Sequence, residues 1–168
     1  MTERMTKYRW FWVWDFEKEE QWFNEMAEQG WVLESVGFCR YTFRQCEPGE
    51  YTVRMEMHPY EPEYIEFMEE TGAELVGRVF QWIYLRKKTS DGEFNIFSDI
   101  DSRIEHLQKI ARVLMIIGFM NIAVGLLNAF NPTHVGFLNM MCAALLMYGL
   151  GRIHGKIESL ENSRQIHE

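Results

Sequence analysis

The chain has 168 residues, a formal net charge of −8 and an isoelectric point near 5.2. This acidity argues against a nucleic-acid-binding protein, because phosphate contacts require a basic surface. The three cysteines are odd in number and lack metal-ligand spacing, which indicates reduced, structural thiols. The polar N-terminus does not resemble a signal peptide.

The first 88 residues are predicted to form one domain that contains an internal repeat. At a fixed offset Gly30 matches Gly72, Phe38 matches Phe80 and Arg44 matches Arg86. Each half reads as strand, helix, strand, and Gly30 and Gly72 suit helix C-caps. The expected elements are strand 8–14, helix 18–29 and strand 33–45, bent at Gly37, in the first half, then strand 51–57, helix 61–71 and strand 75–87 in the second.

This βαββαβ order predicts a ferredoxin-like α+β sandwich, with four antiparallel strands and both helices on one face of the sheet. Because side chains alternate along a strand, residues of one parity, which include Ile83 and Leu85, should pack under the helices against residues that include Ile65 and Met68. The opposite parity should lie on a face that no helix covers. It carries Trp10, Trp12, Trp14, Trp82 and Tyr84, together with Arg40, Arg44, Arg54 and Arg86.

An exposed aromatic face of this kind normally marks an interaction surface. One interpretation is self-association, in which two open sheets stack and bury the tryptophans in a homo-oligomer. A second is a binding site for a flat, amphipathic or aromatic small molecule held by stacking and Arg hydrogen bonds. Single-stranded nucleic acid is a third and weaker interpretation, because no glycine-rich RNA-binding signature is present and Glu56 lies in the same patch. Contact with another part of the chain or with the membrane surface also stays open.

A polar linker is expected at 89–97, followed by a cytoplasmic stalk helix at 98–112. Ser98 and Asp101 have the spacing of a helix-start capping box.

Two apolar runs at 113–130 and 135–151 contain no Asp, Glu, Lys or Arg. As helices they would reach roughly 27 and 25 Å, close to the ~30 Å hydrocarbon layer. We therefore expect a transmembrane hairpin with a turn at 131–134 and a tail helix at 152–168. A buried helical hairpin of a soluble protein is the alternative. Lys and Arg concentrate on the cytoplasmic side of membrane helices, so both termini should be cytoplasmic and the turn external. The basic residues lie before the first run or after the second: Arg103, Lys109, Arg112, Arg152, Lys156 and Arg164.

A seam with coiled-coil spacing runs along both predicted helices. Outside the bilayer it consists of Ile and Leu. Inside the bilayer it consists of small and amide residues, which allow close backbone approach and hydrogen bonding. These are Gly118, Asn121, Gly125 and Asn128 facing Gly136, Asn139 and Ala143. The asparagines could alternatively line a substrate path, although no carboxylate accompanies them.

No catalytic constellation is apparent, so we expect a non-enzymatic protein without a metal or other cofactor. The five histidines are scattered over different predicted segments. No nucleophile motif or phosphate-binding glycine loop occurs. The many glutamates of the two predicted helices suit solvated helix faces.

Two segments carry a family resemblance: Trp22-Phe23-Asn24-Glu25-Met26-Ala27 with Gly30-Trp31-x-Leu33, and 80–87, FQWIYLRK. With the apolar tail, they resemble the bacterial domain of unknown function 2812 over roughly 7–99. Gln81 and Leu85 depart from the Gly and Phe that relatives often have. The resemblance implies membrane segments in many members and a neighbouring gene for a PadR-like transcriptional regulator. It implies no catalytic or binding residues.

These observations favour a membrane-anchored sensor or regulatory module. Its cytoplasmic domain would bind a ligand or protein partner, such as a PadR-like regulator, through the aromatic and Arg face. The alternative is a small transporter or envelope-stress component that acts through an oligomerised helical hairpin.

Overall fold

The computed structural model describes residues 3–129 and 135–167, so the turn predicted at 131–134 lies outside the described residues. The chain divides after Ile96 into an N-terminal unit and a helical unit. The N-terminal unit contains β1 (Arg4–Tyr8), the short 3₁₀ helix η1 (Val13–Asp15), α1 (Phe16–Glu28), β2 (Trp31–Gly37), β3 (Arg40–Gln45), β4 (Tyr51–Met57), α2 (Pro62–Glu70), β5 (Ala73–Val79), β6 (Trp82–Lys88) and η2 (Thr89–Asp91).

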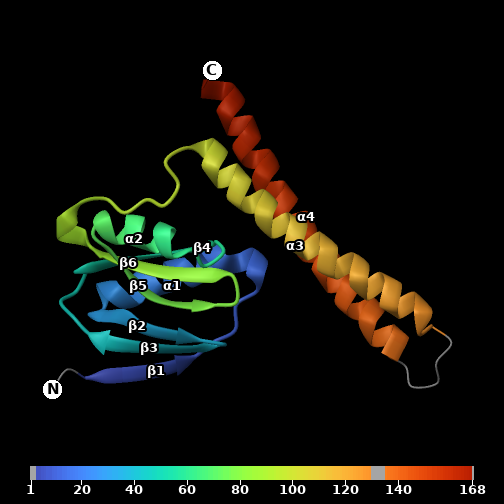
Figure 1. The fold of residues 1–168 in the computed structure, drawn as a ribbon, viewed down its shortest axis with the longest axis horizontal. Coiled ribbons are helices and arrows are strands. Elements are labelled where there is room, and N and C mark those ends of the chain that lie inside the picture. The colour runs from blue at the N-terminus through green and yellow to red at the C-terminus, as the bar shows by residue number, and fades with distance from the viewer. Residues whose placement is uncertain (1–2, 130–134, 168) are drawn as a thin grey trace. The chain divides into compact units, whose positions relative to one another are not determined.

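The N-terminal unit is an α+β structure with two three-stranded antiparallel sheets, ordered β1-β3-β2 and β4-β6-β5 (Figure 1). The identical strand order confirms the internal repeat, because each half is strand, helix, strand, strand. β2 and β5 lie side by side. A Cβ on Gly77 would come within 3.0 Å of the Val36 side chain. Six strands in two sheets replace the single four-stranded ferredoxin-like sheet that the sequence predicted.

The missing strands come from two hairpins that were predicted as single long strands. The segment 33–45 turns at Phe38–Cys39, and 75–87 turns at Phe80–Gln81. Cys39 and Phe80 both have φ 54°, in the left-handed region that normally selects glycine. Neither two-residue turn contains Gly, Asn or Asp, so the pattern predicted a bend at Gly37 in the first segment but no reversal in either.

The predicted strand 8–14 is also wrong. β1 pairs with β3 from Arg4 opposite Arg44 to Tyr8 opposite Arg40, where β3 begins. Beyond that pair Arg9 still donates its N–H to the Cys39 carbonyl in the turn, and residues 10–12 then leave the sheet and form the connection to η1 and α1. The tryptophans in this connection alternate as they would in a strand, but they do not belong to one.

Helix α1 contacts both sheets. Trp22 packs edge-on against Tyr41 and Phe43 of β3, with ring centroids 5.3 and 5.4 Å apart. The neighbouring Phe23 ring lies 5.3 Å from Tyr41 of β3 and 6.0 Å from Tyr84 of β6. The polar side chain of Asn24 reaches the outer edge of β4, where it accepts from the backbone N–H of Val53 and donates to the Val53 carbonyl.

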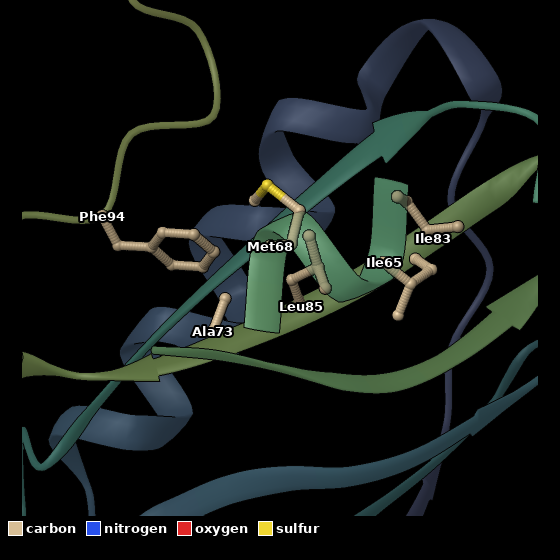
Figure 2. Close-up of a cluster of buried hydrophobic side chains, with 6 residues drawn as sticks. All are labelled: Ile65, Met68, Ala73, Ile83, Leu85 and Phe94. Atoms are coloured by element: carbon tan, nitrogen blue, oxygen red, sulfur yellow. The ribbon is translucent and has the colours of Figure 1, made fainter. Parts of the chain in front are cut away.

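Helix α2 covers the opposite face of the β4-β6-β5 sheet (Figure 2). There Ile65 and Met68 pack with Ile83 and Leu85 in a buried cluster. The sequence correctly placed these four together. The prediction that both helices lie on one face of the sheet is wrong, because α1 covers one face of β6 and α2 covers the other. This explains why Trp82, Ile83, Tyr84 and Leu85 are all buried.

The segment after β6 belongs to the N-terminal unit and is not a free linker. The Phe94 side chain is 6% exposed in the α2 cluster, and Ile96 packs beside it. Nε of Arg54 donates to the Phe94 carbonyl over 2.9 Å. Apolar burial therefore extends the domain to Ile96, past the predicted boundary at residue 88.

The helical unit consists of α3 (Ile100–Leu127) and α4 (Val135–His167), which run antiparallel (Figure 1). The predicted stalk and first membrane segment are one continuous helix. Its capping box is formed by Asp99 and Ser102, one residue later than the predicted pair. The first turn of α3 contacts the last part of α4, where Arg164 donates to the Asp101 carboxylate over 2.7 Å.

Candidate functional site

Four exposed aromatic side chains form a continuous surface cluster, which we call the aromatic tip: Trp10, Trp12, Phe38 and Phe80. Trp10 contacts Trp12 edge-on, with ring centroids 5.3 Å apart, and Phe38 at 5.8 Å. Phe38 contacts Phe80 at 6.1 Å. The exposed fractions range from 40% for Trp12 to 83% for Phe80. Such rings are well packed against one another but leave their outer surfaces in water, which is typical of a contact surface.

The fold brings these residues together from three separate segments. Phe38 and Phe80 occupy equivalent positions at the ends of the β2-β3 and β5-β6 hairpins. Because β2 and β5 lie side by side, both hairpin ends reach the same place. Trp10 and Trp12 come from the connection between β1 and α1. Beneath them Trp14 is buried and stacks on Trp12 at 5.0 Å, which anchors the cluster to the core.

Exposed arginines lie in the segments that carry the aromatic tip. Arg9 precedes Trp10, Arg40 follows the first hairpin turn, and Arg78 lies near the end of β5. The Arg9 guanidinium lies over the Phe11 ring at 4.8 Å, and Arg78 lies over Tyr60 at 4.6 Å. Phe11 and Tyr60 are not part of the aromatic tip, so these two guanidinium groups are held on neighbouring rings.

Three aromatic residues of the predicted open face are buried and not available for binding: Trp14, which is 4% exposed, Trp82 and Tyr84. Trp82 is 8% exposed and packs on Phe16 at 5.4 Å. Tyr84 is 4% exposed, contacts Phe23, and donates its hydroxyl to Glu19 over 3.1 Å. Helix α1 covers this face of β6, so the predicted open sheet face does not exist at these positions.

Three of the four predicted arginines serve internal contacts. Arg54 pairs with Glu20 at 3.2 Å. Arg86 pairs with Glu74 at 2.7 Å and donates to the Leu33 carbonyl of the other sheet. Arg44 donates to the Tyr51 hydroxyl, and both Arg44 and Arg86 stack on the Tyr51 ring. Of the predicted set, Trp10 and Trp12 meet in the aromatic tip, and Arg40 lies exposed beside its first hairpin turn.

A buried carboxylate joins the two halves of the domain. Glu19 is 7% exposed and accepts hydrogen bonds from the hydroxyls of Tyr41 at 2.8 Å and Tyr84 at 3.1 Å. Burial raises the pKa of Glu19, and it raises the pKa of both tyrosines as well. The group therefore connects α1 with both sheets.

The glycines predicted along the seam lie where α3 and α4 approach most closely. A Cβ on Gly118 would come within 2.6 Å of Met147, and one on Gly136 within 2.7 Å of the Asn128 carbonyl. Gly125 and Ala143 are buried as well. The amides of Asn121, Asn128 and Asn139 each donate to a carbonyl four residues earlier in their own helix. Each of these amides thus makes a hydrogen bond within its own helix.

Both helices are long and apolar enough to cross a membrane. Less than a third of each apolar window is buried, whereas the helix of a soluble core would be mostly covered. Large apolar side chains point away from the seam on both helices: Ile116, Ile117, Phe119, Met120, Leu126, Leu127, Phe137, Leu138, Met141 and Leu145. This exposed apolar surface supports an association with membranes.

Sequence reasoning missed Phe38 and Phe80 as site residues. The internal repeat already matched Phe38 with Phe80. Their equivalent positions in the two halves were the sequence signal that would have identified them as a pair. Within residues 3–129 and 135–167, no group of three His, Cys, Asp or Glu side chains is placed to hold a metal ion.

Comparison with known proteins identifies the family and nothing beyond it. No curated protein and no protein of known structure is detectably similar to this chain. The family model described as protein of unknown function (DUF2812) matches residues 15–119. The match begins at Asp15, directly before α1, and ends at Phe119 within α3. It covers more than half of the chain. The protein is therefore a member of the DUF2812 family.

Proposed function

We propose that this protein is a non-enzymatic, membrane-anchored sensor or regulatory module. The α3-α4 hairpin fixes it in the cell membrane with both termini in the cytoplasm. The N-terminal unit captures a protein partner or an amphipathic ligand. The binding surface is the aromatic tip instead of the sheet face suggested by strand parity. A PadR-like transcriptional regulator is the candidate partner, on the basis of the family resemblance.

The observation that carries this proposal is the exposure of the aromatic tip. Four large rings in mutual contact stay open to water while nearby tryptophans and tyrosines are buried. Leaving that much apolar surface in water is unfavourable by ~25 cal/mol per Å², and a partner that covers it recovers this free energy. Aromatic residues with Arg are also the side chains that dominate binding at protein interfaces.

The proposal is tested by a matched pair of phenylalanine substitutions in the full-length protein in detergent. The variant Phe38→Ala/Phe80→Ala removes the two hairpin rings, and Phe67→Ala removes a ring of similar exposure on α2, away from the aromatic tip. The probe is a purified PadR-like regulator of the kind that the family resemblance places beside such genes, and the measurement is its dissociation constant. We expect the double variant to bind at least ~10-fold more weakly. Phe67→Ala should bind like the wild type.

Equal binding by all three proteins would remove the aromatic tip from the proposal. If the wild type does not bind the regulator at all, this partner is excluded. Tryptophan fluorescence is the folding control, because all six tryptophans lie in the N-terminal unit.

A further inference from the structure

β1 is an outer strand whose free edge has no strand partner within the described residues. The backbone N–H of Gln45 donates to the Glu3 carbonyl, and the N–H of Arg9 donates to the Cys39 carbonyl. The backbone N–H and C=O groups of the odd-numbered residues in β1 therefore point toward β3. Because hydrogen-bonding directions alternate along an antiparallel strand, the N–H and C=O groups of Arg4, Thr6 and Tyr8 point outward.

The corresponding strand of the second half is closed. At β4, Asn24 of α1 makes two hydrogen bonds with the backbone of Val53, at 2.8 and 3.0 Å. Glu20 accepts from the backbone N–H of Met55 at 3.0 Å. Two side chains of α1 thus take the place of a neighbouring strand at β4. The repeat therefore has one closed outer edge and one open outer edge.

Charged side chains usually protect an exposed edge strand from pairing. In β1 both cations are engaged elsewhere. Arg4 forms a two-point ion pair with Glu34 of β2, at 2.8 Å, so its side chain reaches inward across β3. Lys7 lies on the helix side of the sheet, with its ammonium 3.4 Å from the sulfur of Met26. Neither cation guards the free edge.

One register pairs the whole length of the β1 edge with itself. When two copies of β1 run antiparallel about Thr6, Thr6 lies opposite Thr6 of the second copy and Arg4 lies opposite Tyr8. These are the residues whose backbone groups point outward, so each opposed pair exchanges two hydrogen bonds. Met5 then faces Lys7, and no like charges oppose one another. A register centred on Arg4 would place two guanidinium groups together, which is unfavourable.

We propose that β1 is a dimerisation edge, and that its occupant is the β1 strand of a second copy of this chain, paired antiparallel about Thr6. The contact is isologous, so it closes a two-fold dimer and leaves no free β1 edge. Anchoring of both copies in one membrane raises their effective concentration, which favours a short interface of this kind. The inference rests on the β1 edge and on the membrane anchoring of the proposed function, and it does not depend on what the aromatic tip binds.

Disulfide crosslinking in native membranes tests the inference. The background is the full chain with Cys39, Cys46 and Cys142 changed to Ser, into which either Thr6→Cys or Thr52→Cys is introduced. Opposed Cα atoms in a hydrogen-bonded antiparallel pair are ~5.5 Å apart, within disulfide range. We expect Thr6→Cys to give a covalent dimer in most molecules under mild oxidation. Thr52 lies in β4, the closed outer strand, so Thr52→Cys should stay monomeric.

A second variant distinguishes strand pairing from random collision. Thr6→Pro removes only an outward N–H, which an edge strand tolerates. In a chain carrying Tyr8→Cys, we expect crosslinking to Arg4→Cys of a co-expressed copy, and Thr6→Pro should reduce its yield several-fold. Thr6→Ala should leave that yield unchanged. Crosslinking of Thr6→Cys no greater than that of Thr52→Cys, or a yield insensitive to Thr6→Pro, overturns the inference.

Discussion

Glu19 shows how one residue can connect both halves of the domain. Its position among the glutamates of α1 predicted a solvated side chain, but it turns inward and accepts from Tyr41 and Tyr84. Tyr41 comes from β3 and Tyr84 from β6, so a single carboxylate satisfies hydroxyls from two sheets. A buried hydroxyl without an acceptor costs ~1–3 kcal/mol, so the Glu19 carboxylate provides an acceptor that both tyrosines need.

We predict opposite effects for two substitutions at Glu19. Glu19→Ala leaves two buried hydroxyls without an acceptor and should lower the free energy of unfolding by roughly 2–5 kcal/mol. Glu19→Gln keeps an acceptor oxygen and removes the buried charge, so it should be more stable than the wild type at neutral pH. Urea unfolding of the full-length protein in detergent, followed by tryptophan fluorescence, measures both.

The pH dependence follows from the direction of the pKa shift. The folded-state pKa of Glu19 is raised, so protonation favours the folded protein. That stabilisation is complete below the unfolded pKa of 4.5 and is lost as the pH rises through the folded pKa. The advantage of Glu19→Gln over the wild type should therefore shrink as the pH falls toward 4.5. A constant difference across this range would contradict the assignment.

At the scale of elements, close packing of α3 and α4 depends on residues without side chains. A Cβ at Gly136 would meet backbone atoms of Asn128 and Gly125 at 2.7–2.9 Å. Backbone atoms cannot move aside as the end of a flexible side chain can. Gly155, farther along α4, has open space around its Cα. The two glycines therefore have different structural roles in one helix.

We predict that Gly136→Ala and Gly155→Ala change stability in opposite directions. Gly136→Ala should destabilise the hairpin by ~1–3 kcal/mol, because the helices must separate to admit the methyl group. Gly155→Ala should stabilise α4 by ~0.5–1 kcal/mol through its higher helix propensity. Thermal unfolding in detergent, monitored by ellipticity at 222 nm, compares them. Equal melting temperatures for the two variants would show that the seam does not require a glycine at position 136.

At the scale of the whole molecule, the excess acidity belongs to the N-terminal unit. Residues up to Ile96 contain 11 basic and 19 acidic side chains, whereas the helical unit contains 6 of each. Within the helical unit the six basic residues lie in the parts of α3 and α4 distant from the connecting turn. Lys and Arg near membrane helices remain on the cytoplasmic side. This distribution underlies the proposed orientation.

We predict that reporters at either end of the chain remain in the cytoplasm. Green fluorescent protein fused to the N-terminus or the C-terminus should fluoresce, and alkaline phosphatase fused there should be inactive. Alkaline phosphatase fused after Asn131 in a truncated chain should be active, since the preceding helix would deliver it outside. Phosphatase activity at the C-terminus would contradict the two-pass orientation.

The sequence by itself determined the features that local pattern controls. The repeat, β4, both domain helices with their glycine caps and the two long apolar helices all follow from periodicity, capping residues and apolar length. Ile65 and Met68 were also correctly matched with Ile83 and Leu85, because their parity and spacing agree.

Only the tertiary structure decided which strand faces are covered and where the binding surface lies. The turns at Cys39 and Phe80 adopt a left-handed conformation without glycine, so no local signal revealed the hairpins. Helix α1 then contacts both sheets, which buries Trp82 and Tyr84 and leaves Trp10 exposed beside Phe38. Burial depends on which distant segments pack together, and alternation along a strand carries no information about a helix that covers its second face.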